Sequence, residues 1–87
     1  MHCRQAVFDR AFVEDLAYRA RTDRRRGLRT LKLVDAVLRD PFGGLGKPEP
    51  LRGELSRRWS RRIDTEHRLA YQVTDDRVHF LAAPYHY

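Results

Sequence analysis

The sequence has few of the residues that build covalent or metal-held sites. Cysteine occurs once in 87 residues, as Cys3, which excludes an internal disulfide and a cysteine-based zinc site. The four histidines are scattered, and no group of His, Asp and Glu has the spacing of metal ligands. The segment Gly43-Gly-Leu-Gly46 follows an expected helix rather than a strand, so it is no nucleotide-binding loop. We therefore predict neither a metal nor another cofactor.

Long hydrophobic runs are also missing. No apolar run approaches the roughly 18–20 residues that a bilayer span requires. The first residues, Met1 to Gln5, have no apolar signal-peptide stretch behind them. We expect no membrane partner and a cytoplasmic location.

Charge of one sign prevails instead. The chain has 18 Lys and Arg against 12 Asp and Glu, a net charge of +6 and a pI near 10.2. Arginine far outnumbers lysine, which favours planar, bidentate contact with phosphate. A basic domain of this size commonly meets nucleic acid, anionic lipid or an acidic protein, and charge alone does not choose among them.

We expect one domain over residues 1–87, with helices in its first half. A short strand at 4–8 precedes a helix at about 10–21, for which Asp9 is the candidate N-cap, and Asp23 offers the N-cap of a second helix that runs to about Leu38. Asp40-Pro41 ends this helix. The spacing of its apolar residues predicts a buried face of Leu28, Leu31, Val34 and Leu38.

The second half reads as a loop and then a sheet. Residues 41–54 hold three of the four prolines and four of the five glycines, and a loop this long in a small domain is usually functional or disordered. From Trp59 the period is two, which predicts strands at 59–63, 68–73 and 78–83. The fold class is therefore α+β, with helices on one face of an antiparallel sheet and the other face open for a site.

Two arginines are candidates for that open face. If the turn centres on Thr65, Arg62 and Arg68 lie nearly opposite each other, an arrangement that an anion between them would stabilise. The alternative is that both are solvated, or paired with carboxylates of Glu54, Asp64 and Glu66.

Two other segments carry groups suited to proton transfer. Glu49 stands between two prolines, which restrict its backbone and suit a carboxylate held near one hydroxyl, although an exposed loop glutamate is the alternative. The end of the chain holds His86 between Tyr85 and Tyr87, and the unperturbed pKa of histidine, about 6.5, suits acid–base work. The alternative for Tyr85, His86 and Tyr87 is a role in surface contacts or packing.

The joint order of these segments resembles the YoeB (Txe) toxins of the RelE superfamily. The resemblance is dense over residues 40–87 and looser over the helical half. It rests on Asp40-Pro-Phe-Gly43, Gly46-Lys-Pro-Glu-Pro-Leu51, Gly53-Glu-Leu55, Trp59-Ser-Arg-Arg-Ile63, Glu66-His-Arg-Leu69, Tyr71 and Tyr85-His-Tyr87.

The resemblance implies a RelE-like fold and an endoribonuclease that cleaves mRNA in the A site of the 70S ribosome by metal-free acid–base catalysis. It implies Glu49 as the general base, His86 as the general acid and Arg68 as the group that stabilises charge on the scissile phosphate. It further implies neutralisation by a YefM-like antitoxin and leaves a homodimer open. The residues it implies for substrate binding are Lys47, Arg52, Arg62, Tyr85 and Tyr87.

A second reading belongs to another class of protein. Pro84 replaces the basic residue that commonly precedes Tyr-His-Tyr in these toxins, which removes a charge and a backbone donor. A basic module that binds nucleic acid or an antitoxin but has lost cleavage is therefore the alternative function.

Overall fold

The computed structural model describes residues 4–51 and 57–81. The chain forms a first strand, two consecutive helices and then a sheet, in the order expected. The elements are β1 (Gln5–Phe8), α1 (Arg10–Thr22), α2 (Arg24–Arg39), β2 (Glu49–Pro50), β3 (Arg58–Arg62), β4 (Arg68–Val73) and β5 (Arg77–Phe80). The segment expected to be loop throughout thus contains the short strand β2.

The strands form one five-stranded sheet in the order β1-β5-β4-β3-β2. The pairs β3–β4 and β4–β5 are antiparallel, as expected, and so is the pair β2–β3, but β1 runs parallel to β5. The reason is that β1 is connected to the other strands through both helices, and a crossover of this length allows parallel neighbours that a tight hairpin does not. The expected α+β fold with helices on an antiparallel sheet is confirmed, and β1 adds one parallel pair to that sheet.

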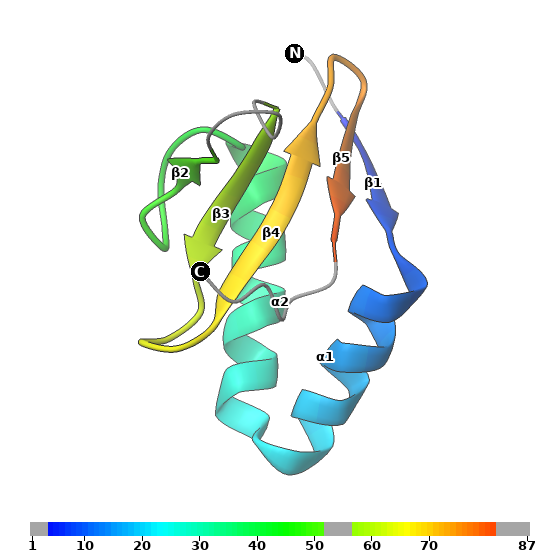
Figure 1. Ribbon diagram of the computed structural model, residues 1–87, viewed down its shortest axis with the longest axis vertical. Coiled ribbons are helices and arrows are strands. Elements are labelled where there is room, and N and C mark those ends of the chain that lie inside the picture. The colour runs from blue at the N-terminus through cyan, green and yellow to red at the C-terminus, as the bar shows by residue number, and fades with distance from the viewer. Residues whose placement is uncertain (1–3, 52–56, 82–87) are drawn as a thin grey trace.

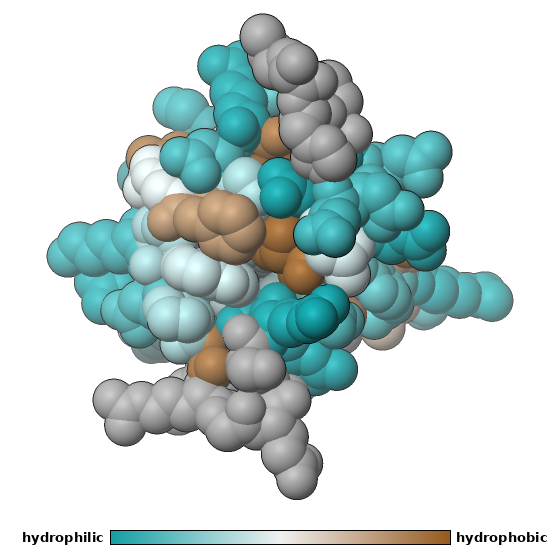
Figure 2. Space-filling model, turned by 90° about the horizontal axis from the view of Figure 1, so that it is seen from above, coloured by the Kyte–Doolittle hydropathy of each residue, from teal (hydrophilic) through white to brown (hydrophobic). Residues whose placement is uncertain are grey.

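The two helices lie on one side of the sheet, with α2 behind β3 and β4 in the view of Figure 1. Between these layers lies the core, whose fully buried members include Phe12, Leu33, Val37, Leu69, Tyr71, Val78 and Phe80. Neither helix of the described ranges is long and apolar enough to cross a membrane. Seen from the end at which β4 and β5 are joined, the surface is mostly hydrophilic, with the largest group of hydrophobic atoms near its centre (Figure 2).

The ends of α2 agree with the capping expected from the sequence, whereas the cap expected from Asp9 at the start of α1 is wrong. The Asp23 carboxylate accepts a hydrogen bond from the backbone N–H of Arg26 at 3.2 Å, so it caps α2. Asp40 follows the last residue of α2, directly before Pro41. Asp9 precedes α1 but makes no side-chain cap, and its carboxylate instead lies 2.5 Å from Nε2 of His79 on β5.

The face of α2 that packs on the sheet is not the one expected. Val34 is buried as expected, but Leu28, Leu31 and Leu38 are 55%, 51% and 37% exposed, so that prediction was wrong for them. The buried positions are Gly27, Thr30, Leu33, Val34 and Val37. Small side chains on this face let α1 approach closely, since a Cβ at Gly27 would lie 2.9 Å from the Cα of Ala20.

A buried arginine fixes the loop that follows α2. Arg61 is 0% exposed, and its Nε donates a hydrogen bond to the hydroxyl of Tyr71 at 3.1 Å. The Tyr71 hydroxyl in turn donates to the carbonyl of Pro41 at 2.7 Å. The guanidinium donates to three further loop carbonyls, those of Asp40, Gly43 and Leu45. The loop that leads to β2 is therefore tied to β3 and β4.

Candidate functional site

The sheet face turned away from the helices carries the two arginines that the sequence singled out. Arg62 on β3 and Arg68 on β4 are direct cross-strand partners, which confirms the expected pairing. Arg61 and Leu69, their neighbours in sequence, are buried on the helix side. Because successive side chains of a strand point to opposite faces, Arg62 and Arg68 lie on the outer face.

Strand β2 adds a carboxylate to the same face. Glu49 is paired in register with Ser60, and Pro50 with Trp59. The Glu49 Oε2 atom lies 3.4 Å from Nη2 of Arg68, with the two side chains 63% and 21% exposed. Glu49 is exposed, as expected for the alternative of an exposed loop glutamate. It nevertheless lies on a strand and faces one of the candidate arginines. The structure thus brings Glu49 and Arg68 together.

Ser60 orients the Arg68 guanidinium, and sequence reasoning missed it. The side chain is 1% exposed, and its hydroxyl accepts a hydrogen bond from Nε of Arg68 at 3.0 Å. Nη2 of Arg68 is buried and makes no hydrogen bond to the described residues, although it lies within ion-pair distance of Glu49. With Nε held by Ser60, the two terminal nitrogens remain for a ligand that supplies oxygen atoms.

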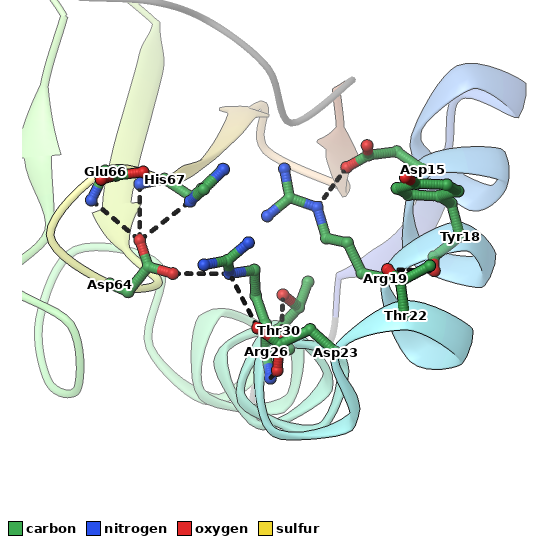
Figure 3. Close-up of polar contacts among 10 residues, drawn as sticks. All are labelled: Asp15, Tyr18, Arg19, Thr22, Asp23, Arg26, Thr30, Asp64, Glu66 and His67. Atoms are coloured by element: carbon green, nitrogen blue, oxygen red, sulfur yellow. Dashed lines mark hydrogen bonds and ion pairs between the residues drawn. The ribbon is translucent and has the colours of Figure 1, made fainter.

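The turn between β3 and β4 is built around Asp64 (Figure 3). Its carboxylate accepts from the backbone N–H groups of Glu66 and His67, both at 2.8 Å, and from Nε of Arg26 on α2 at 2.6 Å. His67 Nδ1 lies 3.0 Å away. Burial alone would raise the pKa of Asp64, but these hydrogen bonds together hold it well below its usual range. The turn that aligns the two arginines is therefore anchored to α2.

Arg62 carries its charge without a carboxylate partner among residues 4–51 and 57–81. Asp64, considered as its partner, is engaged by Arg26 instead. The Arg62 backbone is fixed, because its N–H donates to the carbonyl of Gly46 at 2.7 Å. The face therefore holds two cations opposite each other and one carboxylate beside them, a net positive site that an anion would stabilise.

Of the five remaining candidate site residues, the structure describes one, Lys47. Lys47 is exposed, has a positive φ of 52° and stands two residues before Glu49. Within the described ranges, no group of three or more His, Cys, Asp or Glu could hold a metal ion. The expectations for Arg52, Tyr85, His86 and Tyr87 lie outside the described residues.

The fold and this face define a small basic α+β protein with a carboxylate and two arginines on its outer sheet face. A family model described as "YoeB-like toxin of bacterial type II toxin-antitoxin system" matches residues 8–87. A toxin YoeB of Mycobacterium bovis is 51% identical over 84 residues, which are 97% of this chain and 99% of the relative. The chain belongs to the family of YoeB-like toxins of bacterial type II toxin–antitoxin systems.

Solved structures agree with this family and confirm the RelE-like fold. A YoeB dimer from Staphylococcus aureus has a TM-score of 0.86 and 33% identity, with 97% of this chain and 98% of that chain covered. A YoeB–YefM complex from the same organism has a TM-score of 0.82 and 32% identity, over 97% and 98% of the two chains.

Proposed function

We propose that this toxin is a ribosome-dependent endoribonuclease that cleaves mRNA in the ribosomal A site. The observation that carries the proposal is the contact between Glu49 and Arg68, at 3.4 Å, on the outer sheet face beside Arg62. A carboxylate can take a proton, and arginines can hold a phosphodiester, so the face unites the two requirements for cleavage of RNA by its own 2′-hydroxyl.

The reaction needs no nucleophile from the protein. Glu49 takes the proton of the ribose 2′-hydroxyl, and the oxygen attacks the adjacent phosphorus. The bond from phosphorus to the 5′-oxygen of the next nucleotide then breaks, which leaves a 2′,3′-cyclic phosphate. We assign His86 as the acid that protonates the departing 5′-oxygen, on its position in the sequence. The acid and the base would each contribute about 10²–10⁴-fold to the rate.

Arg68 stabilises the charge that develops on the phosphate, with Arg62 assisting. When the phosphate binds, it replaces Glu49 as the partner of the Arg68 guanidinium, and the exposed Glu49 carboxylate turns to the 2′-hydroxyl. Ser60 keeps Nε of Arg68 fixed during this exchange, so the guanidinium does not follow the carboxylate. Lys47, Arg52, Tyr85 and Tyr87 complete the proposed contacts to the substrate.

The partners follow from the same proposal. The 70S ribosome would order the mRNA codon in line for attack, a contribution that a small open sheet face does not supply alone. A YefM-like antitoxin would neutralise the toxin, which the YoeB–YefM complex from S. aureus supports. The dimer solved for YoeB of S. aureus supports a homodimer, and we assign a cytoplasmic location.

The test is primer extension on a defined mRNA in a purified translation system. Wild-type toxin should cut at A-site codons only when ribosomes are present, and Glu49→Gln or His86→Ala should each lower the cleavage rate by about 10²–10⁴-fold. Glu66→Gln is the matched control, because the Glu66 side chain is exposed on the β3–β4 turn and should leave the rate unchanged.

Three outcomes are informative. Cuts that depend on ribosomes and vanish in both variants support the mechanism. Cuts that persist in Glu49→Gln would remove Glu49 as the base. If folded wild-type toxin binds ribosomes but makes no cut, the protein is a binding module instead, and Pro84→Arg becomes the first reversion to test.

A further inference from the structure

The end of the molecule at which β4 and β5 are joined carries a hollow with an aromatic centre and a basic rim. Its volume is about 290 Å³, and its lining includes Arg4, Phe42, Arg57, Trp59, Val73, Thr74 and Asp75. Figure 2 looks onto this end, where the largest group of hydrophobic atoms is surrounded by hydrophilic ones. None of the lining residues takes part in the acid–base chemistry proposed above, so the hollow is a separate feature of the surface.

Phe42 supplies an exposed ring on a backbone that is firmly held. The carbonyl of Pro41, before it, accepts from the Tyr71 hydroxyl at 2.7 Å. The carbonyl of Gly43, after it, accepts from the Arg61 guanidinium at 2.8 Å. The ring itself is nevertheless 50% exposed. An occupant that covers the ring would bury apolar surface that folding leaves in water.

Two neighbours make Phe42 part of a stacking platform. The ring of Trp59 lies 5.2 Å from that of Phe42, between centroids, and is tilted by 57°. The Arg4 guanidinium lies over the Phe42 ring, 5.7 Å from its centroid, and its Nε donates to the carbonyl of Thr74 at 2.9 Å. Aromatic rings and guanidinium planes are the groups on which unpaired nucleobases stack in proteins. The hollow therefore offers a base both kinds of surface.

The charge of the rim favours a phosphate-bearing ligand. Arg57 is exposed and has no ion-pair partner among residues 4–51 and 57–81. The described lining has two arginines and one carboxylate, that of Asp75, so positive charge is in excess. Positive charge beside aromatic rings fits single-stranded nucleic acid better than an apolar peptide, because a phosphate accompanies every base.

The hollow is continuous with the outer sheet face through the start of β3. Arg58 and Arg62 point to the same outer face, because side chains alternate along a strand. Arg57 directly precedes β3 and lines the hollow. It lies five residues from Arg62, which is about 17 Å in an extended strand. A nucleic-acid strand with one phosphate at Arg62 can therefore follow this line of arginines to the hollow.

We propose that the hollow is a second subsite for the RNA strand, in which a nucleotide away from the scissile phosphate stacks its base on Phe42 and Trp59 and places its phosphate on Arg57. The subsite tolerates any base, since every base presents a face for stacking. That this strand is the substrate rests on the proposed function. Binding, however, is measured without cleavage, so the two ideas can fail separately.

The first experiment is a fluorescence titration of the full chain with single-stranded 2′-O-methyl RNA, which lacks the 2′-hydroxyl needed for cleavage. Trp59 is the only tryptophan of the sequence, so its emission reports on the hollow. We expect the RNA to quench this emission. An abasic strand of the same length keeps the phosphates and removes the bases, so it should bind about tenfold or more weakly and leave the emission unquenched.

Variants separate the stacking from the charge. Phe42→Leu keeps an apolar contact with Trp59 but removes the ring, and should raise the Kd for RNA about tenfold. Leu45→Ala, exposed on the same loop, is its control and should leave the Kd unchanged. Arg57→Gln should lower the slope of log Kd against log salt by about 0.7, the share of one phosphate contact. Arg10→Gln, which removes an equal charge from α1, is its control.

A second experiment locates the subsite on the ribosome, where the A-site codon fixes the register of the mRNA. One abasic nucleotide is placed in turn at each position before and after that codon, and cleavage of end-labelled mRNA is followed on gels. One position should raise the KM of the wild type about tenfold. Phe42→Leu should be indifferent to the abasic nucleotide at that position, because it has already lost the stacking. Circular dichroism verifies that each variant is folded.

The proposal fails if the abasic strand binds as tightly as RNA, or if Phe42→Leu binds RNA as Leu45→Ala does. It also fails if RNA leaves the emission of Trp59 unchanged while a YefM-type antitoxin alters it, since the occupant is then a protein. Normal cleavage that is indifferent to Phe42→Leu and to every abasic position would remove the subsite and leave the nuclease. RNA that stacks in the hollow of a toxin that makes no cut would do the reverse.

Discussion

Replacing Tyr71 by phenylalanine tests whether the Arg61–Tyr71 pair holds the loop that leads to Glu49. The Tyr71 side chain is fully buried, and its hydroxyl donates to the Pro41 carbonyl at 2.7 Å while accepting from Nε of Arg61 at 3.1 Å. Burial raises the pKa of Tyr71, and the hydrogen bond and charge of Arg61 offset this only in part. The hydroxyl therefore stays protonated, and remains a donor, throughout the ordinary pH range.

The magnitude follows from what the hydroxyl contributes. Tyr71→Phe keeps the ring in the core and removes two hydrogen bonds, one of which involves a charged group. Leaving a buried carbonyl unpaired costs about 1–3 kcal/mol, and a hydrogen bond to a charged group contributes about 1.5–3 kcal/mol. Because the Arg61 guanidinium keeps its carbonyl acceptors, we expect the free energy of unfolding to fall by about 2–4 kcal/mol. That is a large share of the roughly 5–15 kcal/mol typical of a domain.

Urea unfolding followed by the fluorescence of Trp59 measures this loss. Tyr18→Phe is the matched control, because Tyr18 is 59% exposed, and it should change stability by less than about 0.5 kcal/mol. Hydrogen exchange gives a local readout: the Arg62 amide, bonded to Gly46 in the same loop, should exchange faster in Tyr71→Phe. A Tyr71→Phe variant as stable as Tyr18→Phe would refute the reasoning.

Two further predictions concern the outer face and its turn. Ser60→Ala should lower kcat/KM for mRNA cleavage about tenfold, because it releases the Arg68 guanidinium. Ser60→Thr keeps the hydroxyl and should restore the rate. Equal rates in the alanine variant and the wild type would show that Ser60 does not position Arg68. Asp64 has a lowered pKa in the folded state, so its contribution to stability is full above the unfolded pKa of about 4 and is lost as the pH falls below it. Unfolding by urea at pH 7 and pH 3 should therefore show wild type more stable than Asp64→Asn at pH 7 and this advantage reduced at pH 3; an advantage equal at both pH values would contradict the assignment.

The strands were predictable because one face of the sheet is buried. A period of two in residues 59–73 assigns each side chain to a face, and a shift by one residue would expose the whole apolar set. The pairing of Arg62 with Arg68 followed from the turn at Thr65 and is what the structure shows. Strand β2 was not predictable, since two residues between prolines carry no period, and only its pairing with β3 makes Glu49 part of the sheet.

The helices show where a pattern in sequence is ambiguous. On α2, Leu28, Leu31 and Leu38 form one stripe, and Gly27, Thr30, Leu33, Val34 and Val37 form another beside it. Each stripe has three large apolar side chains, so hydrophobicity alone does not choose between them. Packing selects the second stripe, because Gly27 lets α1 approach to a distance at which a Cβ would contact Ala20. Leu28, Leu31 and Leu38 are therefore left on the surface of α2.

Arg61 and Arg62 show how neighbours of one residue type acquire different roles. The alternation of β3 places them on opposite faces, one buried among loop carbonyls and the other exposed opposite Arg68. Either substitution to alanine would lower cleavage, but for different reasons. Arg61→Ala leaves unpaired the carbonyls that fix the loop before Glu49 and opens a cavity in the core, so it should lower the free energy of unfolding by about 3–5 kcal/mol. Arg62→Ala removes the proposed phosphate contact, so it should raise KM and leave stability nearly unchanged. Stability and kinetics measured together therefore separate the two arginines where activity alone does not.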